Sequence, residues 1–421
     1  MSIFYNAIGT SNKARKLIIY EGTTVYDGKE YFEMSSSEIY KMRVLKSNAS
    51  KIIPVLKTKN ESFEESYDNF VKLADKIIAD TDGRLNLYKT GSLSNTALKL
   101  FFEMIGANAP CDPITADEAR WINNCNQGAI INQIDYMGDI HNYDINSMYQ
   151  AILKNKHFKI PTKTGTFVKI PKDEFDKLTF YKFGIYRVEI MTDESYSKLF
   201  RFNKNNYYTS FDLTQARSYG LKIHYIECDF NFLYYGANTF ENGSILFKEF
   251  VDYMYELRKR TGDKVYKTIA NSLWGALVQS NLRKLTYSLD DENFNFDFND
   301  DVEILWQVPK SNNKFQICYV KKDKYFKYPF ARLKPFILAF GRQMLGRMIE
   351  PHIDNIYRIH TDGWSSSKLL DIKLTDEMGG LRYEGVQKNI AIVHVNKIID
   401  LNDVQFEDLD KLAEFFKRYD N

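Results

Sequence analysis

The chain has 421 residues, of which 44% are hydrophobic and 27% charged, and its formal net charge is only +2. This composition excludes a disordered or a polycationic protein, and the length allows a core divided between two or three lobes. No run of about 18 apolar residues occurs, so we expect neither membrane insertion nor secretion. The four cysteines are widely spaced without a C-x-x-C pair, which argues against a zinc module or a disulfide framework and fits a reducing cytoplasm.

The N-terminal part of the chain predicts short strands and turns, followed by two helices. Apolar side chains recur at helical spacing over residues 62–78, which predicts the first helix. The second helix, over 96–105, has Ser92 or Ser94 as its cap.

The middle of the chain predicts a hairpin, a β-rich segment and then two consecutive helices. Strands over 130–137 and 140–145 are separated by a Gly-Asp turn, and residues 158–235 alternate as strands do. Helices over 244–260 and 264–279 are joined by a Gly that ends the first and an Asp that caps the second. This connection predicts an antiparallel helical hairpin.

The last third of the chain predicts an exposed acidic segment, a long helix and a small C-terminal lobe. The acidic, Asn- and Phe-rich segment covers 290–303, and the helix covers 333–349. A strand carrying Asp362 follows this helix. Residues after about 378 form the lobe, which ends in a charged helix over 406–419.

Two carboxylates stand at the edges of apolar, strand-like runs. Asp144 ends the run 140–145, and Asp362 follows the run 356–359. Two such edges lying side by side can hold divalent metal ions, which in-line phosphoryl transfer requires. A lone Asp at a strand end, however, is usually just solvated.

The second helix of the hairpin has a polar front and a packed back. A step of about 100° per residue places Lys267, Asn271 and Trp274 on one face of the helix. An ammonium, an amide and an indole suit a phosphate, a base edge and a stacked base. Taken alone, however, the pattern favours an ordinary amphipathic helix whose lysine is solvated.

Three segments occur in a meaningful order: D-I-N-S-M-Y-Q from Asp144, K-x-x-x-N-S-x-W-G from Lys267, and R-I-H-T-D-G from Arg358. They resemble motifs A, B and C of family B DNA polymerases, most closely the protein-primed phage and plasmid branch. The resemblance covers about residues 90–400. It implies an α+β right-hand fold with an antiparallel-sheet palm, helical-hairpin fingers and a small thumb.

The resemblance also implies a division of the chain. Residues 1–89 form an N-terminal region, which we expect to be a truncated or replaced exonuclease domain. Residues 90–243 form the palm with an insert, and 244–280 the fingers. Residues 281–377 form a second insert and the rest of the palm, and 378–421 the thumb.

Site residues can be carried over from the three motifs position by position. The carboxylates of Asp144 and Asp362, with the backbone of Ile145, would ligate two Mg²⁺ ions, and Mn²⁺ is an alternative. Lys267 would act on the incoming triphosphate. The other residues implied to bind the nucleotide are Ile145, Asn146, Ser147, Met148, Tyr149, Arg258, Lys259, Asn271 and Trp274. Of these, Tyr149 would lie under the sugar and exclude a 2′-hydroxyl.

A further set of residues is implied to contact DNA. Gly128 and Ala129 match half of the Y-x-G-G/A segment that holds the template in relatives. The other residues of this set are Ser272, Gly275, His360, Thr361 and Lys397. Lys397 stands near the place of the family's K-x-Y, of which only a shifted Lys is present.

The chain departs from the family pattern at several positions. Met148 and Gln150 replace Leu and Pro, and Trp274 replaces Tyr. His360 occupies the place of the first Asp of motif C, and imidazole is a poor ligand for Mg²⁺ but tolerates Mn²⁺ better. No D-x-E with a matching N-x-x-F-D occurs, so we expect no proofreading exonuclease.

The implied function is template-directed addition of deoxynucleotides to a primer 3′ end, in the replication of a viral or plasmid genome in the host cytoplasm. The implied partners are template and primer DNA, dNTPs and, in the protein-primed branch, a terminal protein. Two alternatives remain open. One is a catalytically weakened relative that binds nucleic acid or a replication partner, which His360 favours. The other is an untemplated or RNA-making nucleotidyltransferase.

Overall fold

The computed structural model describes residues 16–35, 38, 39, 42, 52–106, 111–191, 196, 198–288, 301–310 and 313–402. Contacts within the chain define two compact units. The first comprises residues 1–110 and 246–277, and the second comprises residues 111–245 and 278–421. The expected helix over 406–419 and most of the acidic segment 290–303 lie outside the described residues.

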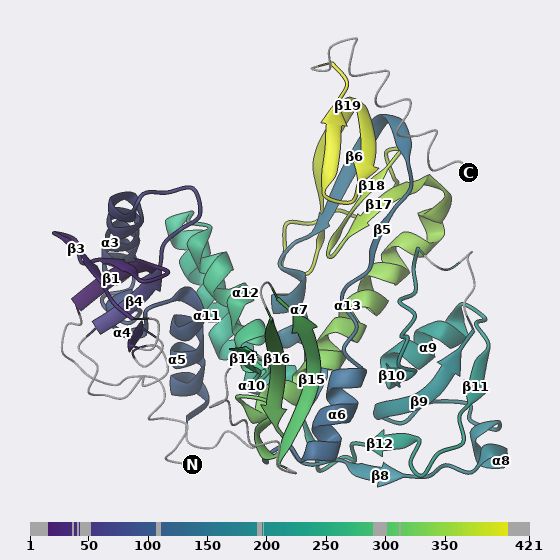
Figure 1. The fold of residues 1–421 in the computed structure, drawn as a ribbon. Helices are drawn as coiled ribbons and strands as arrows, with labels where there is room; N and C mark the ends of the chain where they lie inside the picture. The colour runs from purple at the N-terminus through teal and green to yellow at the C-terminus, as the bar shows by residue number, and fades with distance from the viewer. Residues whose placement is uncertain are drawn as a thin grey trace. The chain divides into compact units, whose positions relative to one another are not determined.

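The first unit contains a four-stranded sheet covered by one long helix (Figure 1). Its strand order is β3 (Tyr31–Glu33), β2 (Thr24–Tyr26), β1 (Lys16–Glu21), β4 (Ile52–Leu56), with β4 parallel to β1. Helix α3 (Phe63–Asp80) begins at a capping box in which Ser62 and Glu65 each bond the other's backbone amide. Phe63 and Tyr67 of this helix pack on a core that includes Ile19, so the helix predicted over 62–78 is confirmed.

The first unit also holds the helical hairpin, which is formed by α11 (Lys248–Thr261) and α12 (Val265–Leu277). Two further helices, α4 (Leu87–Thr90) and α5 (Leu93–Ile105), precede the hairpin in the chain. Gly262 ends α11 with a φ of 69°, and the Asp263 carboxylate accepts a hydrogen bond from the Val265 amide at 2.8 Å. The predicted Gly stop and Asp cap are therefore confirmed, and so is Ser92 as the cap of α5. Helix α5 packs against α12, which the sequence did not reveal.

The second unit is built around a six-stranded antiparallel sheet. Its order is β20 (Lys397–Asp400), β19 (Leu381–His394), β6 (Tyr136–Ile145), β18 (Gly363–Ser366), β17 (Ile356–His360), β5 (Ile131–Gln133). Tyr143, Ile145, Ile359 and Trp364 are all buried. Because alternate residues of a strand point to opposite faces, these four side chains leave the other face to Asp144.

Smaller sheets and helices complete the second unit. The segment predicted to be β-rich forms β7 (Lys159–Pro161), β8 (Thr166–Val168), β9 (Gly184–Ile190), β10 (Tyr207–Thr209), β11 (Ile223–Tyr225), β12 (Phe232–Tyr234) and, just beyond it, β13 (Phe240–Asn242). A separate sheet contains β14 (Arg283–Ser288), β16 (Lys314–Lys321) and β15 (Val302–Pro309). The α-helices described in this unit are α6 (Ala116–Asn124), α7 (Met148–Leu153), α8 (Lys172–Phe175), α9 (Ser210–Ser218) and α13 (Leu333–Ile349), together with all but the last residue of α10 (Gly243–Leu246).

Helix α13 crosses the second unit and contacts α7, α9 and β7. Its Arg342 forms a buried ion pair with Asp212 of α9, with an N–O distance of 2.8 Å. A second buried pair joins Arg332, just before α13, to Glu118 of α6 at 2.7 Å. Removing one partner of such a pair leaves an unpaired charge in the core and costs about 3–5 kcal/mol.

Among the helices of the described residues, none is long and apolar enough to cross a membrane.

Candidate active site

Asp144 lies one residue from the end of β6, in the middle of the six-stranded sheet. Its register partners are Gly363 on β18 and Arg382 on β19. Directly opposed residues of antiparallel strands point to the same face, so Gly363 and Arg382 flank the Asp144 carboxylate.

Asp362 lies in the tight turn between β17 and β18. Thr361 in this turn has a φ of 64°, a left-handed conformation, and its amide donates to the carbonyl of Ile130 at 3.2 Å. The carbonyl of Asp362 accepts a hydrogen bond from the amide of Ile145, the residue after Asp144, at 2.9 Å. The structure thus brings the two carboxylate-bearing segments, far apart in the sequence, into direct contact.

His360 lies in the same row of the sheet as Asp144. It is paired with Gly363 on one side and with Ile131 of β5 on the other. Because neighbouring strands are about 4.8 Å apart, the Cα atoms of His360 and Asp144 are separated by roughly 10 Å, with Gly363 between them. The imidazole therefore belongs to the Asp144 face, and no side chain stands between the two residues in that row.

The segment after Asp144 is held tightly from behind. Asn146 is buried and donates its side-chain amide to the carbonyl of Asp376 at 2.8 Å. Ser147 has a φ of 53°, donates to the Asn146 side chain at 3.3 Å and starts α7, and Met148 is 1% exposed. These three side chains are hydrogen-bonded or buried within the protein, so a nucleotide bound here would contact mainly the backbone.

Tyr149 is half-buried on α7. Burial raises the pKa of its phenol to about 12, and the negative charge of Asp362 adds to this shift while Arg342 opposes it. The ring lies near Gly341 of α13, where an added Cβ would be 3.4 Å from Tyr149 Cε1. Tyr149 is therefore a neutral phenol at neutral pH, and it lies near enough to Asp362 to feel the charge of that carboxylate.

The helical hairpin presents the residues expected to bind the triphosphate. On α12, Asn271 is exposed and Lys267 and Trp274 are half-buried, as are Ser272 and, on α11, Arg258. The opposite side of α12 is buried through Tyr266, Ile269, Ala270, Leu273, Ala276 and Leu277. Lys259 Nζ lies 4.8 Å from the centroid of the Tyr255 ring. Gly275 is exposed. All these residues belong to the first compact unit, whereas Asp144 and Asp362 belong to the second.

The expected DNA contacts of the second unit are distributed over its loops. Gly128 is exposed and Ala129 half-buried, and the carbonyl of Gly128 accepts a hydrogen bond from Arg342 Nη1 at 2.8 Å. Lys397 is exposed at the start of β20, next to a turn whose Val395 carbonyl accepts a hydrogen bond from Arg358 at 2.6 Å.

Sequence reasoning missed two residues next to the site. Arg342 could have been found, because it is a charged residue within the largely apolar helix 333–349 and a buried charge requires partners. Arg382 offered no such signal, since its position beside Asp144 depends on the register between β19 and β6.

The donor set suits a hard divalent cation. Two carboxylates and the backbone around Ile145 could supply oxygen ligands, which Mg²⁺ prefers, and such sites usually leave positions for phosphate oxygens. Among the described residues, no group of three or more His, Cys, Asp and Glu side chains could hold a metal ion alone. His360 would add a softer nitrogen donor to the same face.

Comparisons with known proteins agree with this geometry. Residues 53–328 match the model of the family described as DNA polymerase type B, organellar and viral. This range includes Asp144 and Lys267 but not Asp362. No curated protein is significantly similar in sequence.

Solved structures of phi29 DNA polymerase have a similar fold. The complex with primer-template DNA, a post-translocation binary complex, is 14% identical with a TM-score of 0.51, covering 77% of this chain and 57% of that chain. The complex with single-stranded DNA is 15% identical with a TM-score of 0.52, covering 96% and 78%. The ternary complex with primer-template DNA and incoming nucleotide substrates is 15% identical with a TM-score of 0.51, covering 92% and 74%. The predicted α+β right-hand polymerase fold is thereby confirmed.

Proposed function

The chain belongs to the organellar and viral type B DNA polymerases, and from this membership we propose that it adds deoxynucleotides to a primer 3′ end as directed by a DNA template. The observation that carries the proposal is the hydrogen bond of 2.9 Å between the Ile145 amide and the Asp362 carbonyl. It joins the backbones of the two carboxylate-bearing segments, which supports a two-metal site for in-line phosphoryl transfer.

Asp144 and Asp362 are proposed to hold two Mg²⁺ ions, with Mn²⁺ as the alternative. Bound there, the ions would lower the pKa of the primer hydroxyl and stabilise the leaving pyrophosphate. Lys267, with Arg258 or Lys259, would neutralise the triphosphate charge, and Trp274 would stack on the nascent base pair. The neutral ring of Tyr149 would lie under the sugar and exclude a 2′-hydroxyl.

The proposed partners are primed template DNA, dNTPs and a priming protein. We also propose that the protein acts in the cytoplasm of the host cell.

We further propose that the protein does not proofread. Purified protein should then leave a mismatched 3′ end intact. Metal-dependent excision that survives Asp144→Asn would contradict the absence of proofreading.

Primer extension in parallel with Mg²⁺ and Mn²⁺ tests the main proposal. Asp144→Asn and Asp362→Asn should each abolish extension while DNA affinity is largely retained, because each removes a metal ligand and no phosphate contact. Near-normal turnover by either variant would overturn the two-metal assignment.

The same assay separates the alternative functions. A wild-type protein that binds primed DNA but extends it with neither metal would be the catalytically weakened relative that His360 favours. Products whose sequence ignores the template, or ribonucleotides that compete freely with deoxynucleotides, would indicate a different nucleotidyltransferase.

A further inference from the structure

The row of the sheet that contains Asp144 continues on both sides of that carboxylate. It runs from Ile131 on β5 through His360 on β17, Gly363 on β18 and Asp144 on β6 to Arg382 on β19. Neighbouring strands are about 4.8 Å apart, so Ile131 and Arg382 are roughly 19 Å from each other, at opposite ends of the row.

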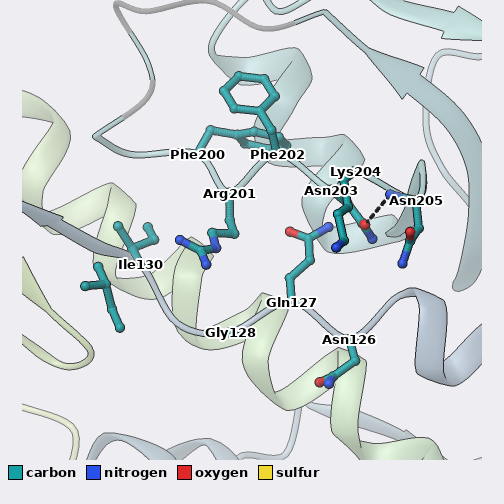
Figure 2. A pocket seen from close by; sticks show the side chains of 11 residues that line it. Asn126, Gln127, Gly128, Ile130, Phe200, Arg201, Phe202, Asn203, Lys204 and Asn205 are labelled. Atoms are coloured by element: carbon teal, nitrogen blue, oxygen red, sulfur yellow. Dashed lines mark hydrogen bonds between the residues drawn. The ribbon is translucent and has the colours of Figure 1, made fainter. Parts of the chain in front are cut away.

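A pocket of about 430 Å³ lies at one end of this row, between the loop 126–131 and the segment 200–205 (Figure 2). Arg201 and Lys204 are the cations that line it. The loop contains the residues that the family resemblance implies to hold the template, so positive charge there has an expected use. Arg382 lies at the opposite end of the row and outside this pocket, and none of the expected contacts uses it.

The two neighbours of Arg382 on β19 fix the face to which its side chain points. Leu381 is buried, and the ring of Tyr383 packs against that of Tyr143 with 5.3 Å between their centroids. Because alternate residues of a strand point to opposite faces, Arg382 shares the face of Asp144. The Cβ atoms of such a directly opposed pair are about 4.5–5.5 Å apart, so the guanidinium can reach a ligand bound at Asp144.

The guanidinium of Arg382 is directed toward the segment that follows Asp144. Its Nε lies 3.8 Å from Asp376 Oδ1. The carbonyl of Asp376 accepts a hydrogen bond from the Asn146 side chain at 2.8 Å, and the carbonyl of Gly380 accepts one from the Asn146 amide at 2.8 Å. The loop that holds Asp376 and Gly380 therefore lies alongside Asn146, where a bound nucleotide would contact the backbone.

Arg382 is available to an anionic ligand. Its ion-pair partner among the described residues is Asp376, and at 3.8 Å this pair is longer than a hydrogen bond. The side chain of Arg382 is 38% exposed and that of Asp376 is fully exposed, and a surface pair of this kind contributes little to stability. Within the described residues, β20 pairs with β19 only from Ile390 onward, so β19 is an edge strand at Arg382. A guanidinium on such an open edge can bind phosphate oxygens through two parallel N–H donors.

We propose that Arg382 binds the triphosphate of the incoming nucleotide, an inference that rests on the proposed polymerase function. The α-phosphate reacts and therefore lies at the metal ions that Asp144 and Asp362 are proposed to hold. The β- and γ-phosphates extend past Asp144 along the segment that contains Asn146, within reach of the guanidinium. Arg382 then neutralises charge on the leaving pyrophosphate from the sheet side of the site.

Binding of the next dNTP to a complex with a dideoxy-terminated primer–template tests Arg382 in the absence of chemistry. Arg382→Ala should weaken dNTP binding about tenfold, as the loss of a charged hydrogen bond does. Arg382→Lys should lie between the two, because it keeps the charge but not the planar fork. The affinity for primer–template without dNTP should be unchanged. The matched control is Lys388→Ala, which removes an exposed cation roughly 20 Å further along the same strand.

Imidodiphosphate, an unreactive analogue of pyrophosphate, identifies the part of the nucleotide that Arg382 binds. It carries two linked phosphates without sugar or base. Calorimetric titration into the same complex should show that Arg382→Ala weakens its binding about as much as that of dNTP. A wild-type affinity for imidodiphosphate together with weakened dNTP binding would overturn the assignment to the phosphates.

Two other results would also overturn the inference. One is an unchanged dNTP affinity in Arg382→Ala. The other is a loss of primer–template affinity at unchanged dNTP affinity, which would make Arg382 a primer contact. Thermal melting should be the same for all variants, because the ion pair between Arg382 and Asp376 is exposed. Should Arg382→Ala melt at a lower temperature, Arg382→Lys serves for the comparison.

Primer extension by wild-type protein distinguishes failure of this inference from failure of the proposed function. If wild type extends primers and Arg382→Ala binds dNTP as tightly as Lys388→Ala, the role of Arg382 is overturned and the polymerase function stands. If wild type extends no primer but Arg382→Ala still weakens dNTP binding, Arg382 binds the nucleotide and the proposed activity fails.

Discussion

Gly363 and Asp144 are register partners, and a Cβ on Gly363 would lie 2.8 Å from the carbonyl oxygen of Tyr143 and 3.6 Å from Asp144 Oδ1. Strands β6 and β18 therefore leave no room for a side chain at this position. The contact is with backbone, which no side-chain rotation can relieve. Gly363 therefore permits the close approach of the two carboxylate-bearing segments.

Gly363→Ala should lower both stability and activity. Forcing the strands apart costs about 1–3 kcal/mol, as overpacking does elsewhere. A shift of the Asp144 carboxylate by about 1 Å should reduce the extension rate about a hundredfold. Thermal melting and single-nucleotide extension measure the two effects. The control is Gly236→Ala, whose added Cβ would meet only the Tyr234 side chain at 3.4–3.6 Å. Equal effects of the two variants would contradict the role of Gly363.

Lys267→Ala should raise the KM for dNTP and lower kcat. A charge-assisted phosphate contact is worth about 1.5–3 kcal/mol, which corresponds to a loss of about 10- to 150-fold in kcat/KM. Steady-state extension over a range of dNTP concentrations measures it. Lys264→Ala, which removes an exposed lysine just before the same helix, is the control. Lower DNA affinity with unchanged nucleotide kinetics would place Lys267 on the template side.

Much of this arrangement could be predicted from the sequence because it is encoded locally. Helix α3, the turn at Gly262 and Asp263, and the two faces of α12 all follow from periodicity and capping. The order of the three motifs indicated that Asp144 and Asp362 would meet. The sheet row that joins Asp144, Gly363 and His360 could not be predicted, because register depends on pairings between distant segments. The same is true of the packing of α5 on α12.

An ion cluster ties α3 to the turn of the helical hairpin within the first unit. Lys76 Nζ lies 2.9 Å from Asp80 Oδ2 and 2.8 Å from Asp263 Oδ2, and the Tyr266 hydroxyl donates to Asp80 at 2.7 Å. The hydrogen bond from Tyr266 and then that from Lys76 lower the pKa of Asp80, while Lys76 lowers the pKa of Asp263. Carboxylates with lowered pKa values stabilise the fold above their unfolded pKa, near 3.9, and lose this effect as pH falls through the folded value.

Asp80→Asn should therefore reduce stability at neutral pH and flatten its decline in acid. Because these groups are partly exposed, the loss should be only about 1 kcal/mol. Thermal melting between neutral pH and about pH 3 measures the effect. Asp68→Asn removes an exposed carboxylate from the same helix and should leave the profile unchanged. Parallel pH profiles of wild type and Asp80→Asn would show that the cluster does not couple the helix to the hairpin.

His360 gives the last prediction, because its place in the sheet points it to the face of Asp144. The family's Asp at this position would add a negative charge that deepens the site for hard cations. A neutral imidazole leaves the site with one negative charge fewer than that Asp would give and supplies a softer nitrogen. Wild type should therefore need more Mg²⁺ than a site with the Asp would, and it should extend primers faster with Mn²⁺ than with Mg²⁺. His360→Asp should shift the preference toward Mg²⁺, changing the ratio of the two metal dissociation constants about tenfold. His360→Ala should lose the preference for Mn²⁺ without gaining affinity for Mg²⁺.

Calorimetric titration of each metal without DNA measures affinity directly, and extension rates over both metal concentrations measure its consequence. The control is His224→Asp, which adds a carboxylate at an exposed position on β11. Because the titration does not depend on turnover, it reports on His360 even in a variant that extends poorly. Identical metal profiles for wild type, His360→Asp and the control would show that the imidazole does not reach the ions, although Gly363 leaves the row between His360 and Asp144 open.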